Sequence, residues 1–200
     1  MNKRIINGGL ALLLACACAL PANAKTKKTS QCVNPSQMVG SWNIFQGDGL
    51  FTDSKDAVSA AQALDAGQKT LQEVTRGAQP DPGETRVTAD GKMVIFAATE
   101  QAEPPMVIKM MMTASWKMDC NVMTVQMQSL DRFSVTYDER SVSAAQKEEI
   151  RKTQDMLGQA SKDPEFKKPQ RSKILFAGNS YILTEDLSSQ SPGISLLKKK

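Results

Sequence analysis

The chain contains no histidine among its 200 residues. Histidine is the commonest general base and metal ligand of proteins, so catalytic arrangements of the Ser-His-Asp or Cys-His kind cannot form. Neither a Gly-x-x-x-x-Gly-Lys phosphate loop nor a Gly-x-Gly-x-x-Gly nucleotide fingerprint is present. Adjacent acids occur at Asp138-Glu139 and Glu148-Glu149, but we expect the first pair to end a strand and the second to face water on a helix. We therefore expect a protein that is not an enzyme and that uses no cofactor.

Long apolar runs are also scarce, and the one that stands out lies at the N-terminus. Lys3 and Arg4 precede an apolar stretch from Leu10 to Leu20, and Ala22-Asn23-Ala24 has the small-x-small form of a signal peptidase site. We expect residues 1–24 to be a signal peptide, cleaved near Ala24, and the mature protein to be periplasmic or secreted. The alternative is a lipid anchor, because Leu13-Leu14-Ala15-Cys16 resembles the lipobox of bacterial lipoproteins. We expect contact with a membrane only if Cys16 is lipidated.

Neither sign of charge is in large excess. The full chain has 25 basic and 21 acidic residues, and loss of the signal peptide would leave a net charge of +2. So small a charge argues against nucleic acid or a membrane surface as a partner. The remaining length suits one domain that buries a sizeable core. We expect residues 25–36 to form an N-terminal tail and residues 37–200 to form a single domain.

What the sequence does contain is a long run of alternating residues. From Met106 to Met118 every second residue is apolar, and most of the intervening residues are polar. This alternation is typical of a half-buried β-strand. Asp119-Cys120-Asn121 interrupts it with turn formers, and the pattern resumes in the opposite phase at Met123, Val125 and Met127. We expect an antiparallel hairpin whose dry face holds even-numbered residues before the turn and odd-numbered residues after it.

Cysteine is scarce outside the predicted signal peptide, where only Cys32 and Cys120 remain. In an oxidising compartment two cysteines most simply form one disulfide. A redox-active pair is disfavoured because no Cys-x-x-Cys spacing joins them. Two thiolates in a chain without histidine cannot complete a tetrahedral zinc site. The sequence predicts a disulfide that ties the segment before the first strand to the tip of the central hairpin.

Further strands and two helices are predicted around this hairpin. Strand patterns cover the segments 39–45, 85–88, 92–96, 133–137, 173–177, 180–184 and 193–197. Apolar spacings predict an amphipathic helix from about Ser54 to Arg76, and the capping box Ser143-x-x-Gln146 begins a second helix that we expect to end near Ser161. Short turns join nearly all the strands. A mainly β fold is therefore expected, with helical insertions at about 54–76 and 144–161.

Four short motifs lie on the predicted strands: Gly40-Ser41-Trp42, Thr88-Ala89-Asp90-Gly91-Lys92-Met93, Ser115-Trp116-Lys117 and Tyr181-Ile182-Leu183. Together they resemble the small bacterial lipocalin-like (calycin) domains. The resemblance covers the strands and leaves out both helices. It implies that a single antiparallel meander of about eight strands closes into a lipocalin-like barrel, with Trp42 packed across the closed end.

Methionine is the one unusual component of the predicted strands. Seven methionines project from them, most toward the same interior: Met93, Met106, Met110, Met112, Met118, Met123 and Met127. Thioether side chains fill irregular cores and adapt to varied apolar ligands. We therefore expect an exported binding protein that holds a small apolar or amphipathic ligand of the lipid or fatty-acid class. The expected ligand-binding residues are Trp42, Met110, Met112, Trp116, Phe133 and Tyr137.

Two other functions stay open. A barrel with a solid core could bind another envelope protein through its helical insertions. Soft thioethers also bind Cu(I), so an exported methionine-rich protein could handle copper. Copper proteins usually cluster methionine with histidine or cysteine, whereas these methionines alternate evenly along two strands as core residues do. For that reason no residue is predicted as a metal ligand.

Overall fold

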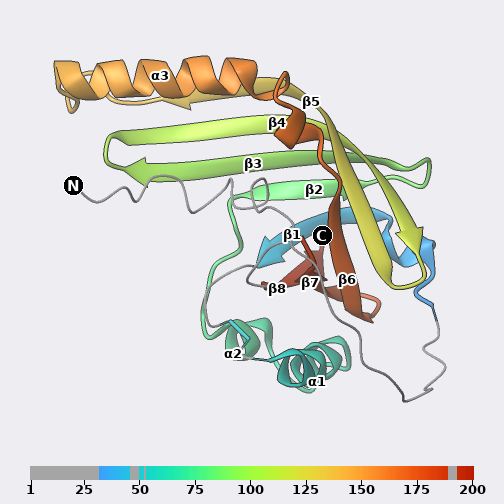
Figure 1. Cartoon of the computed structure of the whole chain (residues 1–200). Helices are drawn as coiled ribbons and strands as arrows, with labels where there is room; N and C mark the ends of the chain where they lie inside the picture. The colour runs from blue at the N-terminus through green and yellow to red at the C-terminus, as the bar shows by residue number, and fades with distance from the viewer. Residues whose placement is uncertain (1–31, 46–49, 52, 189–192) are drawn as a thin grey trace.

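The computed structural model of the chain describes residues 32–45, 50–51, 53–188 and 193–200. The predicted signal peptide, the Cys16 alternative and most of the predicted tail lie outside the described residues. Figure 1 shows the arrangement of the helices and strands. Their bounds are η1 Pro35–Met38, β1 Gly40–Phe45, α1 Ser54–Asp65, α2 Leu71–Thr75, β2 Gly83–Val87, β3 Lys92–Ala102, β4 Pro105–Asp119, β5 Val122–Thr136, α3 Ala144–Ala160, η2 Pro164–Lys167, β6 Gln170–Ala177, β7 Tyr181–Asp186 and β8 Ile194–Lys199.

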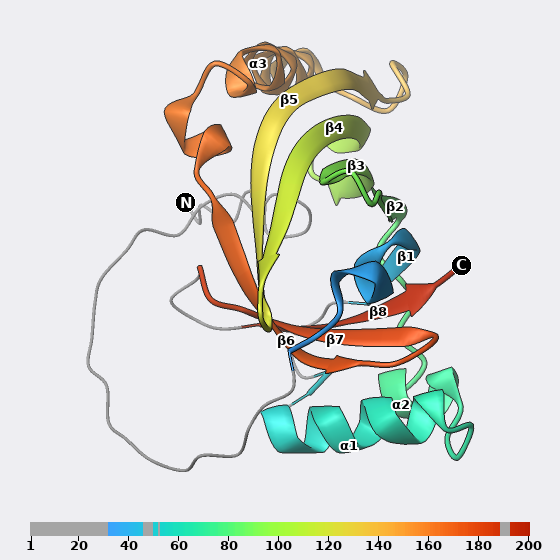
Figure 2. The same cartoon turned by 90° about the vertical axis from the view of Figure 1, so that its right-hand side faces the viewer.

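The eight strands form one closed antiparallel barrel. Each strand pairs with the next along the chain, and β8 pairs back with β1. The closing register places Trp42 opposite Lys199 and Phe45 opposite Leu196, and the ring of strands is seen in Figure 2. The predicted fold class is thereby confirmed: a mainly β chain whose meander closes into a barrel and carries a few helices. No helix among the described residues is long and apolar enough to cross a membrane.

The β4–β5 hairpin has the faces that its sequence predicts. Met118 pairs with Met123, Trp116 with Val125 and Ala114 with Met127, and directly opposed residues of an antiparallel pair share a face. All of these except Met118 are buried. The phase change occurs at the turn, where Cys120 adopts a φ of 52°. Ala114 and Trp116 of β4 therefore line the barrel interior together with the odd-numbered side chains at the start of β5.

β5 is one strand of 15 residues, and the prediction of a separate strand at 133–137 is wrong. Two β-bulges, marked by register shifts between Met111 and Met112 and between Thr113 and Ala114, carry β5 past the point where alternation breaks down. Each bulge moves the inward-facing set by one residue. The hydroxyls of Thr113 and Ser129 donate to the Asp131 carboxylate at the bulged segment, and hydrogen bonds from Ser129 and then Thr113 lower the pKa of Asp131.

Two helices, α1 and α2, replace the single helix expected from 54 to 76. Thr70 caps α2 through a reciprocal capping box with Glu73, so the chain ends one helix and starts another. Ala57, Ala61 and Leu64 of α1 pack against outward-facing Leu183 and Leu196, forming a second apolar cluster outside the barrel. Figure 2 shows α1 and α2 below β7 and β8. These helices cover the outer wall of the barrel on the side away from α3.

η1 closes one end of the barrel. The side chain of Gln37 donates to the carbonyl of Ala177 at the carboxyl end of β6. Trp42 is 0% exposed, and its indole Nε1–H donates to the carbonyl of Met38 at 2.8 Å. The Lys199 ammonium lies 5.6 Å from the Trp42 ring centroid, a cation–π arrangement. Trp42 thus lies at the closed end, as the calycin resemblance implies, with Lys199 placed over its ring.

The Cys32–Cys120 disulfide is formed at this same end, as predicted, and joins residues 88 positions apart. The backbone N–H of Val33 donates to Oδ1 of Asn121 at 2.8 Å, so the segment before η1 is held against the β4–β5 turn by two kinds of bond. Structural disulfides persist in oxidising compartments. The disulfide therefore indicates an extracytoplasmic location.

Candidate ligand-binding site

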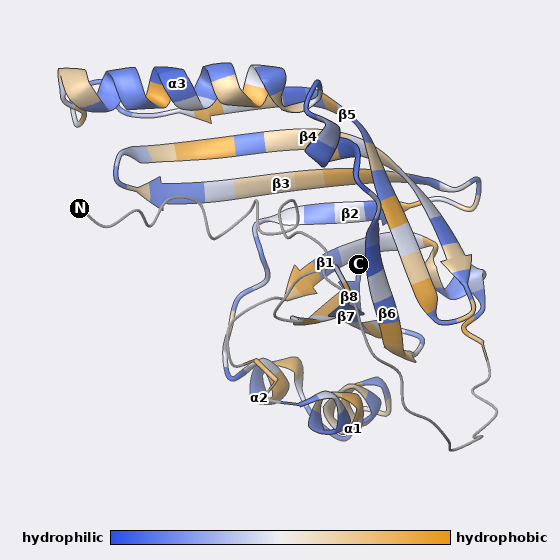
Figure 3. Ribbon diagram, viewed as in Figure 1, coloured by the Kyte–Doolittle hydropathy of each residue, from blue (hydrophilic) through white to orange (hydrophobic). Residues whose placement is uncertain are grey.

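α3 and η2 cover the end of the barrel opposite η1. η1 contacts the carboxyl end of β6, whereas η2 directly precedes its amino end. α3 begins at Ala144, after a capping box between Ser143 and Gln146, and lies beside the far half of β5 in Figure 1. Most of α3 is hydrophilic (Figure 3), and only Ile150 and Leu157 are buried within it. The helix therefore rests on the barrel through a narrow apolar stripe.

Ile150 anchors the amino-terminal half of α3. Its side chain is 1% exposed and packs with Met106 and Val142. Ile108, Val135 and Tyr137 surround this small cluster. Because the cluster lies on the far part of the β4–β5 hairpin, away from η1, it holds α3 without filling the barrel.

A pocket of about 660 Å³ lies under the carboxyl-terminal half of α3. Ligand pockets usually enclose roughly 300 to 1,000 Å³. Its lining comes from β4, β5, α3, η2 and the segment between the two helices: Met110, Met112, Leu130, Asp155, Met156, Leu157, Gln159, Ala160, Lys162, Asp163, Glu165 and Phe166. The pocket therefore forms where strand side chains meet the helical insertion.

The inner wall of the pocket is apolar and continuous with the barrel core. Met112 and Phe166 are both 5% exposed and belong to the same core cluster as Trp42 and Trp116. Met156 is 47% exposed and lies at the outer side of the pocket. An apolar molecule that entered past Met156 would meet side chains that are already part of the core.

The outer rim carries three acids and one lysine, and each acid is engaged within the protein. Asp155 lies 3.9 Å from Arg151, and Glu165 pairs with Lys168 at 2.5 Å. Asp163 accepts the backbone N–H of Glu165 at 2.8 Å and caps η2. The side chain of Lys162 has no hydrogen bond or ion pair in the described part of the chain.

The six residues expected from the sequence are divided among three places. Met110 and Met112 line the pocket. Trp42 and Trp116 lie in the barrel core outside the pocket lining, and the Trp116 indole N–H donates to the carbonyl of Thr88 at 3.0 Å.

Phe133 and Tyr137 lie under α3 and do not line the pocket. Phe133 pairs with Met110 but is 38% exposed, and its ring approaches Gly158 of α3. Tyr137 packs against the cluster around Ile150. The structure therefore brings together two of the six expected residues, Met110 and Met112, at one pocket.

Sequence reasoning missed the pocket residues that the helical insertion supplies. Leu157 and Ala160 lie on the apolar stripe of α3, which predicts that this face packs against the barrel but not that it encloses a space. Met156 and Phe166 also line the pocket. Phe166 follows Pro164 in a short charged segment, and a lone aromatic there is the one signal that marks η2 as packed.

The described residues contain no group of three histidine, cysteine, aspartate or glutamate side chains able to hold a metal ion. Three thioethers, those of Met110, Met112 and Met156, do line the same pocket. Chemically, the site can enclose an apolar group and present a lysine ammonium at its edge.

The closed eight-stranded antiparallel barrel is consistent with the calycin-like fold. No protein-family model matches the chain, and no curated protein matches it. The structure therefore defines a closed eight-stranded antiparallel barrel with an inserted helix, α3, beside a pocket.

Proposed function

We propose that this protein is an exported, non-enzymatic, lipocalin-like binding protein that holds a small apolar or amphipathic ligand of the lipid or fatty-acid class. The observation that carries the proposal is the pocket of about 660 Å³, whose apolar wall continues into the barrel core. Burial of an acyl chain there would remove apolar surface from water on both the ligand and the protein.

The kind of side chain in the pocket supports a flexible ligand. Met110, Met112 and Met156 have unbranched side chains with several rotatable bonds. Such side chains can repack around chains of different length or unsaturation. Leu157 and Phe166, both buried, supply a firmer wall. The site is therefore suited to a class of related molecules and less to one rigid compound.

Filling the pocket tests the proposal. Ala160 lines it, whereas Ala145 is exposed near the opposite end of the same helix. We expect wild-type protein to bind the neutral fluorescent probe Nile red saturably and to release it to oleic acid. Ala160→Trp should abolish probe binding because the indole occupies the pocket, and the matched control Ala145→Trp should bind as wild type does. Equal binding by both variants, or none by the wild type, would contradict the proposal.

Copper handling is another candidate function, because three methionine thioethers line one pocket. Soft ligands of this kind select Cu(I). Native mass spectrometry of protein purified from its own host separates the functions: a retained lipid supports the first proposal, and a bound copper ion supports the second. The bare protein mass would instead favour the alternative function, that of an envelope protein whose helices bind a protein partner.

A further inference from the structure

We infer that the ligand carries a carboxylate head group and that the Lys162 ammonium binds it. This inference rests on the proposed function and adds a chemical class to it: a monoanionic amphipath, with its acyl chain against Met112 and Phe166 and its head at the rim. The argument comes from which charged groups on the rim are already engaged.

Each acid of the rim already has a partner within the protein, a cation for two of them and a backbone N–H for the third. Asp155 has Arg151 as its ion-pair partner and Glu165 has Lys168. Asp163 is committed to the first turn of η2 through the backbone N–H of Glu165. A cationic head group would therefore have to compete with existing partners for each carboxylate.

Lys162 has no such partner among the residues that the structure describes. Lys162 follows the last turn of α3, and its backbone N–H donates to the carbonyl of Gln159. Its side chain lines the pocket and makes no hydrogen bond or ion pair among the described residues. Of the four charged groups on the lining, it is the one that a ligand can pair with at no loss to the protein. An anionic head is the complement of such a group.

Gln159 provides a second donor beside it. Gln159 also lines the pocket, its side chain makes no hydrogen bond in the described chain, and it stands three residues before Lys162. The turn hydrogen bond from the Lys162 backbone N–H to the Gln159 carbonyl keeps the two residues close together. A carboxylate has two oxygens that accept hydrogen bonds, so an ammonium and an amide NH₂ together suit it better than a neutral hydroxyl.

Two ligands of equal chain length test the inference. Oleic acid and oleyl alcohol share their acyl chain and differ at the head, and each displaces Nile red in competition. We expect wild-type protein to bind oleic acid more tightly. Lys162→Gln should weaken the binding of oleic acid by about fivefold, the upper end of the range for an exposed ion pair, and leave the binding of oleyl alcohol unchanged. Added salt should weaken the binding of oleic acid and leave the binding of the alcohol unchanged.

Two further variants separate the head-group role from a general effect. Lys162→Arg keeps the charge and should retain the preference for oleic acid. Lys147→Gln removes an exposed lysine near the other end of α3 and should bind both ligands as wild type does. If Lys162→Gln leaves oleic acid unchanged, or weakens both ligands alike, the carboxylate inference fails while the proposed function stands. If neither ligand nor Nile red binds the wild type, both fail.

Discussion

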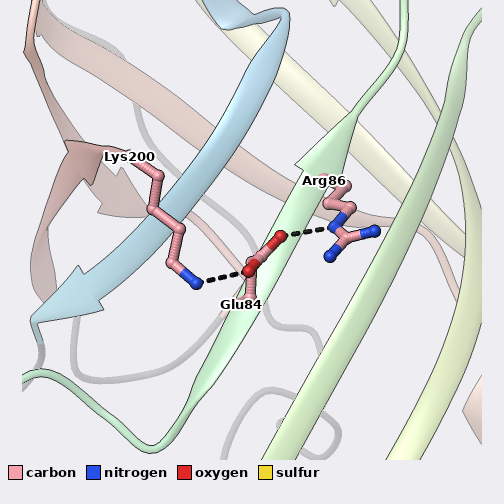
Figure 4. Close-up of polar contacts among 3 residues, drawn as sticks. All are labelled: Glu84, Arg86 and Lys200. Atoms are coloured by element: carbon pink, nitrogen blue, oxygen red, sulfur yellow. Dashed lines mark hydrogen bonds and ion pairs between the residues drawn. The ribbon is translucent and has the colours of Figure 1, made fainter.

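At the scale of single residues, Glu84 of β2 pairs with Lys200, the residue that follows β8. Its carboxylate accepts from the ammonium of Lys200 and from Nε of Arg86, as drawn in Figure 4. The backbone N–H of Lys200 also donates to the carbonyl of Ser41 at 3.0 Å. The hydrogen bonds from Lys200 and then Arg86 lower the pKa of Glu84 from 4.5 to about 2. The last residue of the chain is thereby fastened to β1 and β2.

Replacement of Glu84 should change how stability depends on pH. Because its pKa is lower in the folded protein, the ionised carboxylate stabilises the fold at neutral pH, and this contribution disappears as the pH falls from about 5 to about 2. Glu84→Gln should lower Tm at pH 7, and the difference from wild type should shrink toward zero at the acid end. Thermal unfolding followed by circular dichroism measures both.

Glu100→Gln is the control for this titration. Glu100 is exposed on β3 and has no ion pair in the described part of the chain. It should unfold at the wild-type Tm across the same pH range. A difference between Glu84→Gln and wild type that stays constant from neutral to acid pH would show that the carboxylate charge is not what stabilises the sheet.

Met110 and Met112 allow a test of which face of β4 is dry. Both are buried, at 7% and 5% exposure, whereas Met111 between them is only half-buried and pairs with exposed Arg132 on the outer face. Met110→Asp combined with Met112→Asp should unfold the protein, because two carboxylates would be buried without partners. Met111→Asp should still fold. A double variant with nearly unchanged thermal stability would refute the assignment of faces.

At the scale of elements, we expect α3 to detach from the barrel before the barrel itself unfolds. Ile150 supplies much of its buried contact, and truncation to alanine at such a site costs about 2 to 5 kcal/mol. In Ile150→Ala we expect the amides of α3 to lose protection from hydrogen exchange while those of β7 and β8 keep theirs. Nile red binding should weaken with it, since α3 supplies one wall of the pocket.

Arg151→Ala provides the comparison on the neighbouring residue. Its side chain is 64% exposed and its ion pairs with Glu148 and Asp155 lie at the surface, where such pairs contribute about 1 kcal/mol or less. α3 should stay protected in this variant. If it exchanges as fast as in Ile150→Ala, surface ion pairs and not the apolar anchor hold the helix.

The strands and the helix breaks differ in how far the sequence predicts them. Alternation along Met106–Met118 predicts β4 because one face is buried along most of its length. The same reasoning stops β3 at Phe96, although the strand continues to Ala102 through pairing with β4. The missed break between α1 and α2 has a local signal, since Thr70-x-x-Glu73 is a capping box within the apolar spacing. Because the apolar spacing continues through both segments, it does not show where α2 begins.

The residues of the candidate site also differ in how far the sequence predicts them. The strand residues Met110 and Met112 follow from alternation, since inward-facing positions on a barrel strand are read directly from the sequence. Trp116 belongs to the same inward set but packs toward the closed end, beside Thr88. The position of an inward-facing side chain along the barrel axis depends on which strands extend furthest and on where α3 docks. Both are set by contacts between distant segments, as the pairing of Phe133 with Met110 across two bulges illustrates.

At the scale of the whole molecule, the two ends of the barrel carry separate tasks. η1, Trp42 and the disulfide lie at one end, whereas α3, η2 and the pocket lie at the other. Substitutions at the closed end can therefore change the stability of the fold without altering the residues proposed to bind the ligand.

Removal of the disulfide should lower the stability of the fold and leave ligand binding unchanged. Disulfides typically stabilise proteins by about 2 to 4 kcal/mol, and in the chain-entropy view a bridge between residues 88 positions apart contributes about 4.6 kcal/mol. Cys32→Ser combined with Cys120→Ser should therefore lower Tm by several degrees, and reducing agent should lower the wild-type Tm to the same value without affecting the variant. Below its own Tm the double variant should bind Nile red with wild-type affinity, because neither cysteine lines the pocket. Loss of binding in a variant that is still folded would mean that the closed end controls the mouth.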